Sequence, residues 1–173
     1  MSSTAQIYCL DANVLIQAWQ KYYSPYLCPD YWDILNKLGS EGRIFIPEEV
    51  KNEIVVTEDK EKIEDDLSKW LKRSSIPVHK PTEDVIKCWQ KILQANPLHK
   101  LLVDNVKGRS LADPWVISHA LNMKATVVTK EIHETAMNTK RIKIPNVCDN
   151  MAIRWIDDFA FAKELGLKFS CKI

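Results

Sequence analysis

The fold of this chain is decided by the stretch IYCLDANVLI, residues 7–16. It is a short apolar run that ends at an acid, Asp11, and continues at once into further apolar residues. This pattern is typical of a buried strand that turns into a helix, which places the acid at the carboxyl edge of a parallel sheet, where ligands bind. We therefore expect a strand over residues 7–10, a helix over residues 13–21 and a candidate functional carboxylate at Asp11.

Three more acids occupy comparable points along the chain. Asp113 opens an apolar segment, and Glu131 follows the β-branched run at residues 125–129. Glu53 lies on an expected helix that directly follows a short strand candidate. Because the carboxyl ends of parallel strands meet at one edge of a sheet, we expect these side chains to gather around Asp11.

Two of these acids also have an ordinary structural explanation. Asp11 and Asp113 both suit the cap position before a helix, and Pro114 favours a first helical turn after the second of them. The two roles are compatible, because one carboxylate oxygen can cap a helix while the other binds a ligand.

The other two acids have rivals close by. Glu49 lies one turn before Glu53 on the same side of the expected helix, and either could equally be a solvated surface charge. Glu131 could be an ordinary loop acid, and Glu134 could replace it if the loop turns differently. The choice within each pair stays open at the level of sequence.

Converging acids point to a metal ion. Two carboxylates about 4 Å apart repel each other by roughly 4 kcal/mol at an effective dielectric constant near 20. Such a cluster persists only if protons or cations neutralise it. Oxygen ligands favour Mg²⁺ or Mn²⁺ over zinc, and these ions can activate a water molecule and stabilise the departing oxygen of a phosphodiester. Hydrolysis is the chemistry that this pattern favours.

The composition bounds the class of protein. The chain has 173 residues, which suits a single domain, and 46% hydrophobic and 27% charged residues, which is ordinary globular composition and argues against disorder. The formal net charge is +1, so nucleic-acid binding needs a local basic surface. Five scattered cysteines fit reduced thiols in the cytoplasm, and the sequence indicates neither a signal peptide nor a membrane span.

Alternating helical and strand patterns predict an α/β protein with a central, mainly parallel sheet covered on both faces. A helix is expected to end at Gly39, in the position just past a helix that favours glycine. The other expected elements are helices over residues 31–38, 48–54, 59–72, 82–95, 113–123 and 150–165, strands over 44–46 and 125–129, a weaker strand over 142–144, and a short strand or tail over 167–173.

These residues resemble the PIN domain family, the metal-dependent ribonucleases that include VapC-type toxins. The resemblance covers residues 7–147 and depends on the order and spacing of several short motifs. The matching positions are Leu10-Asp11-Ala12-Asn13, Glu53, Ala112-Asp113-Pro114-Trp115-Val116-Ile117 with Ala120 behind it, and Val128-Thr129-Lys130-Glu131.

The resemblance implies a three-layer α/β/α sandwich with acids around one or two Mg²⁺ or Mn²⁺ ions. It implies metal ligands at Asp11, Glu53, Asp113 and Glu131, and a catalytic role for Thr129 in orienting water or a carboxylate. It also implies an RNA substrate, an antitoxin protein as partner and a homodimer.

Two departures from the family pattern are visible. The fourth acid is more often Asp than Glu, so Glu131 is one methylene longer than usual. The segment 58–97 is long and charged for a small toxin, and we expect it to be a helical insertion, with Trp70 and Trp89 at helical apolar positions.

Cations near the acids are candidates for substrate binding. Arg109 lies shortly before Asp113, and its planar guanidinium suits a phosphate. Lys130 flanks Glu131, and Asn13 would brace the first acid at the substrate edge. His133 and the basic residues at 140–143 are better explained as solvated surface.

Two other functions remain open on the sequence. A phosphatase of the haloacid-dehalogenase type would use Asp11 as its nucleophile. That pattern needs an Asp where this chain has Asn13, and a late acidic pair, for which Asp157 and Asp158 are the candidates. A non-catalytic PIN-like module that binds RNA or protein is the third possibility.

Overall fold

The computed structural model describes residues 5–55, 65–103, 111–136 and 141–170, and its centre is a sheet of five parallel strands in the order β3-β2-β1-β4-β5. The strands are β1 (Tyr8–Leu10), β2 (Ile44–Pro47), β3 (Val78–His79), β4 (Thr126–Val128) and β5 (Trp155–Ile156). The predicted three-layer α/β/α sandwich with a parallel sheet is confirmed.

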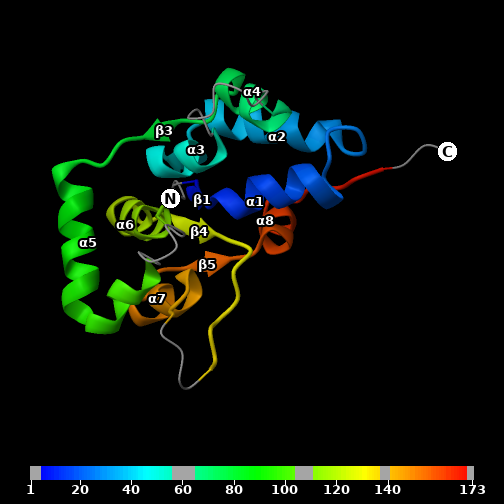
Figure 1. The fold of residues 1–173 in the computed structure, drawn as a ribbon. Helices are drawn as coiled ribbons and strands as arrows, with labels where there is room; N and C mark the ends of the chain where they lie inside the picture. The colour runs from blue at the N-terminus through cyan, green and yellow to red at the C-terminus, as the bar shows by residue number, and fades with distance from the viewer. Residues whose placement is uncertain (1–4, 56–64, 104–110, 137–140, 171–173) are drawn as a thin grey trace.

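Helices cover both faces of this sheet (Figure 1). One face carries α1 (Ala12–Gln17), which continues as the π-helical turn η1 (Ala18–Tyr22), and α2 (Pro29–Ser40), α3 (Glu48–Ile54), α4 (Asp66–Arg73) and α8 (Asp158–Glu164). The other carries α5 (Glu83–Ala95), the 3₁₀ turn η2 (Pro97–Leu102), α6 (Asp113–Met123) and α7 (Ile144–Asn150). Among the described residues, none of the helices has the length and apolar character that a membrane crossing requires.

The central strand β1 shows why the strands read as continuous apolar runs. All three of its residues are buried. Tyr8 packs its ring edge-on against Phe161 of α8, while the thiol of Cys9 points to the opposite face and donates to the carbonyl oxygen of Val116 in α6. Successive side chains therefore meet different helical layers, so both faces of the strand select apolar residues.

Most predicted helices are confirmed, and their ends have clear causes. The hydroxyl of Thr82 accepts a hydrogen bond from the Val85 amide and begins α5. The helix expected over residues 59–72 starts later than predicted, because Asp65 is extended and caps α4 through the Ser68 amide. Residues 59–64 of that expected helix lie outside the described residues.

The region after β4 differs most from the prediction. The strand expected over residues 142–144 is wrong, because Ile144 starts α7 and Pro145 occupies its first turn. The single helix expected over residues 150–165 is also wrong. The chain reverses at Ala152, which has a left-handed φ of 53°, then forms β5 and only afterwards α8.

The segment expected to be a helical insertion contains part of the sheet. Between α4 and α5 the chain forms β3, whose Val78 pairs with Ile46 of β2. Helix α5 packs against α6 on the face of the sheet opposite α2, α3 and α4. The described part of this segment therefore adds an edge strand to the α/β layers.

Gly39 lies inside the last turn of α2, one residue before its end, and not past it as predicted. A Cβ atom at this position would lie 2.7 Å from the backbone Cα of Ile76 and 2.8 Å from the backbone oxygen of Ser75. The glycine is therefore required by close packing of two backbone segments.

Candidate functional site

The pairing of β1 with β4 brings the first acid and a hydroxyl together. Leu10 pairs with Val128, so the residues that follow, Asp11 and Thr129, leave the sheet side by side at its carboxyl edge. The amide of Asp11 continues the ladder by donating to the Val128 carbonyl at 3.0 Å. The predicted placement of Asp11 is thus produced by the strand register.

Thr129 holds the carboxylate of Asp11 in place. The Thr129 hydroxyl donates to Oδ2 of Asp11 at 2.7 Å, and both side chains are buried, at 0% and 3% exposed. The same hydroxyl oxygen accepts from the Glu131 amide at 3.1 Å. One side chain therefore orients the acid of β1 and fixes the start of the loop that carries Glu131.

Asn13 joins helix α1 to that loop. Its Oδ1 accepts from the Lys130 amide at 2.8 Å, and its Nδ2 donates to the Thr129 hydroxyl at 3.5 Å. Asn13 therefore braces the first acid through Thr129 and orders the turn after β4. The substrate-binding role predicted for Asn13 stays a prediction.

The environment of Asp11 disfavours its negative charge. Burial raises the pKa of Asp11 to about 7, the hydrogen bond from Thr129 acts in the opposite direction, and the charges of Glu131 and Glu53 raise it further. A carboxyl group whose pKa is raised close to 7 by burial and by two neighbouring charges is typical of functional sites. A nearby cation would reverse the balance by favouring the charged form.

The charges that act on Asp11 distinguish Glu53 from its rival Glu49 on α3. Glu53 and Glu131 both act on Asp11, and burial together with the Glu131 charge raises the pKa of Glu53, although much of its side chain is exposed. The pKa of Glu49 is raised by burial and by Glu48. Glu53 is therefore the acid of α3 whose charge reaches the carboxyl edge of β1.

Glu131 has a second contact that fixes its direction. Its Oε2 accepts from the amide of Ile144, the first residue of α7, at 2.9 Å. Glu134 instead makes backbone hydrogen bonds to Asn146, and its carboxylate accepts from the Ala136 amide. These contacts favour Glu131 over Glu134 as the fourth acid.

Asp113 is the first residue of α6 and is 7% exposed. Helix α6 packs on β1, where Val116 contacts Cys9. Asp113 lies one turn before Val116, towards the strand end that carries Asp11. The cap position of α6 is Ala112, so Asp113 is not the N-cap residue that its sequence also allowed.

The donor set can be tested for a metal ion. Asp11, Glu53 and Glu131 are oxygen donors whose charges act on one another, which fits the chemistry of a hard cation. Within the described ranges, however, no three or more His, Cys, Asp or Glu residues lie close enough to hold an ion. The oxygen donors match the chemistry of Mg²⁺ or Mn²⁺, but their arrangement in the described residues does not form a group that could hold such an ion.

The structure describes one of the two cations that were predicted to bind substrate, Lys130. The Lys130 ammonium points to α8 and donates to Asp158 Oδ1 at 2.7 Å, with only 16% of the side chain exposed. Arg109 lies outside the described residues. The substrate-binding role of both stays a prediction, and Lys130 already has a buried partner.

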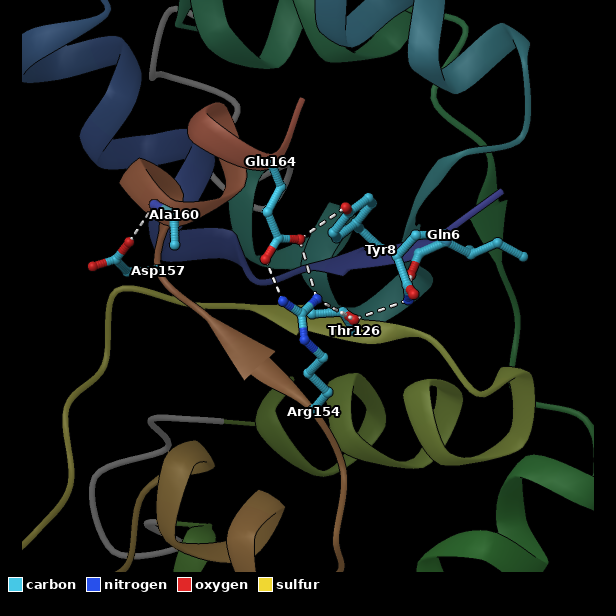
Figure 2. A network of polar contacts seen from close by, with 8 residues as sticks. Gln6, Tyr8, Thr126, Arg154, Asp157, Ala160 and Glu164 are labelled. Carbon is cyan, nitrogen blue, oxygen red and sulfur yellow. Dashed lines mark hydrogen bonds and ion pairs between the residues drawn. The ribbon is translucent and has the colours of Figure 1, made fainter. Parts of the chain in front are cut away.

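Sequence reasoning missed the role of Asp158. It is completely buried and ion-paired, while Asp157 caps α8 by accepting from the Ala160 amide at 2.7 Å (Figure 2). Neither side chain therefore supplies the late acidic pair that a phosphatase centred on Asp11 would need. The available signal was an acid pair directly after the apolar residues of β5.

The arrangement defines a class of α/β protein with acids at the carboxyl edge of a five-stranded parallel sheet. A crystal structure of VapBC2 from Rickettsia felis bound to a promoter DNA fragment matches with a TM-score of 0.58 and 17% identity, covering 88% of this chain and 98% of that chain. The structure of VapBC-1 from nontypeable Haemophilus influenzae matches with a TM-score of 0.54 and 19% identity, over the same shares of the two chains. At these identities the likeness shows the fold, which is PIN-like.

A family model described as "Domain of unknown function (DUF4411)" matches residues 8–169. The chain therefore belongs to this family, and the PIN likeness is one of fold. A comparison with curated proteins finds no match.

Proposed function

We propose that this protein is a Mg²⁺- or Mn²⁺-dependent endoribonuclease that acts as the toxin of a toxin–antitoxin pair. The observation that carries the proposal is the buried carboxylate of Asp11, held by the Thr129 hydroxyl and subject to the charges of Glu53 and Glu131. The likeness of the fold to VapBC structures supports the choice of phosphodiester chemistry.

The side chains take distinct roles in the proposed centre. Asp11, Glu53, Asp113 and Glu131 would hold the cation, whose chemistry would be to activate a water molecule and to stabilise the leaving oxygen. Thr129 keeps the Asp11 carboxylate oriented through its hydrogen bond. Asn13 orders the loop after β4 by accepting from the Lys130 amide. Arg109 remains the proposed phosphate contact.

The partners follow from the same proposal. RNA is the substrate, an antitoxin protein is the inhibitor, and a homodimer is the expected assembly. The four cysteines in the described ranges are all free, which suits the reducing cytoplasm as the place of action.

The test is cleavage of a labelled single-stranded RNA by the purified chain. We expect activity with Mn²⁺, loss with chelator, recovery on adding Mn²⁺ back, and at least a hundredfold loss in Asp11→Asn. The exposed acid Asp33 on α2 offers a matched control, because Asp33→Asn removes a carboxylate that is not among the charges shown to act on Asp11. Cleavage that persists in chelator, or in Asp11→Asn, would contradict the proposal.

A non-catalytic binding module is the second candidate. It is favoured by the finding that no three potential ligands of the described residues lie close enough to share an ion. Calorimetry separates the two candidates, because the module predicts no heat of Mn²⁺ binding and no change in Asp11→Asn.

A further inference from the structure

A fully buried carboxylate lies at the start of α8. Asp158 is 0% exposed, and its Oδ1 accepts from the Lys130 ammonium at 2.7 Å. Its other oxygen, Oδ2, is buried without a hydrogen-bond partner among the described residues. A buried charge is tolerated only when it is paired, so the Asp158 carboxylate depends on Lys130.

The ammonium of Lys130 is enclosed as well as paired. It lies 5.0 Å from the ring centre of Tyr22 and 4.5 Å from that of Phe159. Aromatic faces attract a cation, and they cover it here from η1 and α8. The ammonium is thus held between η1 and α8.

Lys130 is the middle residue of the segment that carries Thr129 and Glu131. This loop has no regular secondary structure, so its position depends on individual contacts. The backbone is tied at the Lys130 amide to Asn13 and at the Thr129 amide to Ile156. The long side chain of Lys130 adds an anchor that reaches across to α8.

We infer that Asp158 is a positioning residue. Through Lys130 it fixes the loop over residues 129–131, and thereby sets the direction of the Thr129 hydroxyl towards Asp11 and the place of the Glu131 carboxylate. This inference assigns Lys130 to positioning, in place of the substrate contact predicted from the sequence. The test of this inference by RNA cleavage rests on the proposed function, whereas the test by amide hydrogen exchange does not.

Helix α8 supplies a matched control. At its other end Glu164 accepts from Arg154 at 3.1 Å and from the Tyr8 hydroxyl at 3.0 Å (Figure 2). This second ion pair lies at the amino ends of β1 and β4, away from Thr129. Asp158→Asn and Glu164→Gln therefore each break one ion pair of the same helix, but only the first releases the loop.

The experiment measures amide hydrogen exchange at Lys130 and Mn²⁺ affinity by calorimetry in both variants. Asp158→Asn is expected to speed exchange at Lys130 at least tenfold and to weaken Mn²⁺ binding about tenfold, as loss of an outer contact does at metal sites. Glu164→Gln is expected to change neither. Unchanged exchange at Lys130 in Asp158→Asn would overturn the inference.

RNA cleavage separates positioning from substrate binding. Positioning predicts that Lys130→Met and Asp158→Asn both lower kcat, with KM within about twofold of the original. If Lys130 instead bound phosphate, Lys130→Met would raise KM and Asp158→Asn, which frees the cation, would lower it. That result would overturn the inference.

A double variant controls for loss of activity caused by simple unfolding. Lys130→Met combined with Asp158→Leu replaces the buried ion pair by apolar side chains, which often preserves stability. It is expected to melt as the original does and still to lose kcat. Should no variant, nor the original chain, bind Mn²⁺ or cleave RNA, the proposed function fails, and exchange at Lys130 still decides the inference.

Discussion

At the scale of the residue, Asp11 links protonation to stability. Burial raises its pKa to about 7 from the ordinary 3.8, against the opposing bond from Thr129. The folded state therefore keeps a proton between about pH 4 and pH 7 that the unfolded chain has released, so the free energy of unfolding falls as the pH rises through this range.

Urea unfolding in chelator measures this effect. From about pH 5 to above pH 7, we expect the wild type to lose roughly 2–3 kcal/mol more than Asp11→Asn, because a shift of one pKa unit corresponds to about 1.4 kcal/mol. Asp33→Asn should follow the wild type, since Asp33 is exposed. Equal pH dependence in wild type and Asp11→Asn would show that Asp11 does not titrate in this range.

Thr129 provides a second prediction at this scale. Thr129→Val keeps the shape of the side chain but removes the donor to Asp11, so the carboxylate loses its orientation and its pKa rises further. We expect Mn²⁺ affinity to fall about 10- to 100-fold by calorimetry. Thr129→Ser restores the hydroxyl and should stay within a few-fold of the wild type; equal loss in both variants would contradict the orienting role.

The places of Asp11 and Thr129 could be predicted because each directly follows an apolar run, so the end of a strand fixes it. The direction of Lys130 could not, because its partner Asp158 comes 28 positions later and lies beyond a strand that the sequence did not reveal. The ion-pair partner of a charged side chain can be identified only once the surrounding helices have been placed in three dimensions.

At the scale of the element, α2 depends on a residue without a side chain. In Gly39→Ala the new Cβ would meet the backbone of Ile76 at 2.7 Å, which outweighs the better helix propensity of alanine. We expect a loss of roughly 1–3 kcal/mol in the free energy of unfolding.

The neighbouring variant Ser40→Ala controls for the change in helix propensity. Ser40 is exposed in the same turn, and its hydroxyl donates only to the Lys37 carbonyl. Its stability should change by less than about 0.5 kcal/mol. A Gly39→Ala protein as stable as the wild type would mean that α2 can shift away from Ile76.

The elements missed by the sequence have a common cause. Strands β3 and β5 are two residues long, too short to show any periodicity. The break between α7 and β5 occurs at Ala152, which takes a left-handed conformation that usually signals glycine or asparagine. The helices with full apolar faces and proper caps, such as α5, were predicted closely.

At the scale of the whole molecule, the near-neutral charge limits how the proposed RNA substrate would be held. With 24 basic and 23 acidic side chains, the chain has no overall attraction for a polyanion. We expect the logarithm of the RNA association constant, measured in chelator, to fall with the logarithm of salt concentration with a slope of about −2 to −3, as for a few phosphate contacts on a single strand.

Fluorescence anisotropy across a salt series gives this slope. Lys124→Gln, at the amino edge of β4 and away from the acids, should leave it unchanged. A slope steeper than about −5 would require a broad basic surface instead.

The parallel sheet itself was predictable from the alternation of elements, whereas the strand order depends on how the crossovers pack.

The outermost strands of the sheet, β3 and β5, each have only two residues. A neighbouring polypeptide that tried to extend the sheet there would find almost no free ladder of amide and carbonyl groups to bind. Aggregation by edge pairing is thereby discouraged on both flanks. We therefore expect a protein partner to recognise side chains presented by the helical layers, with specificity set by surface shape and chemistry more than by main-chain pairing.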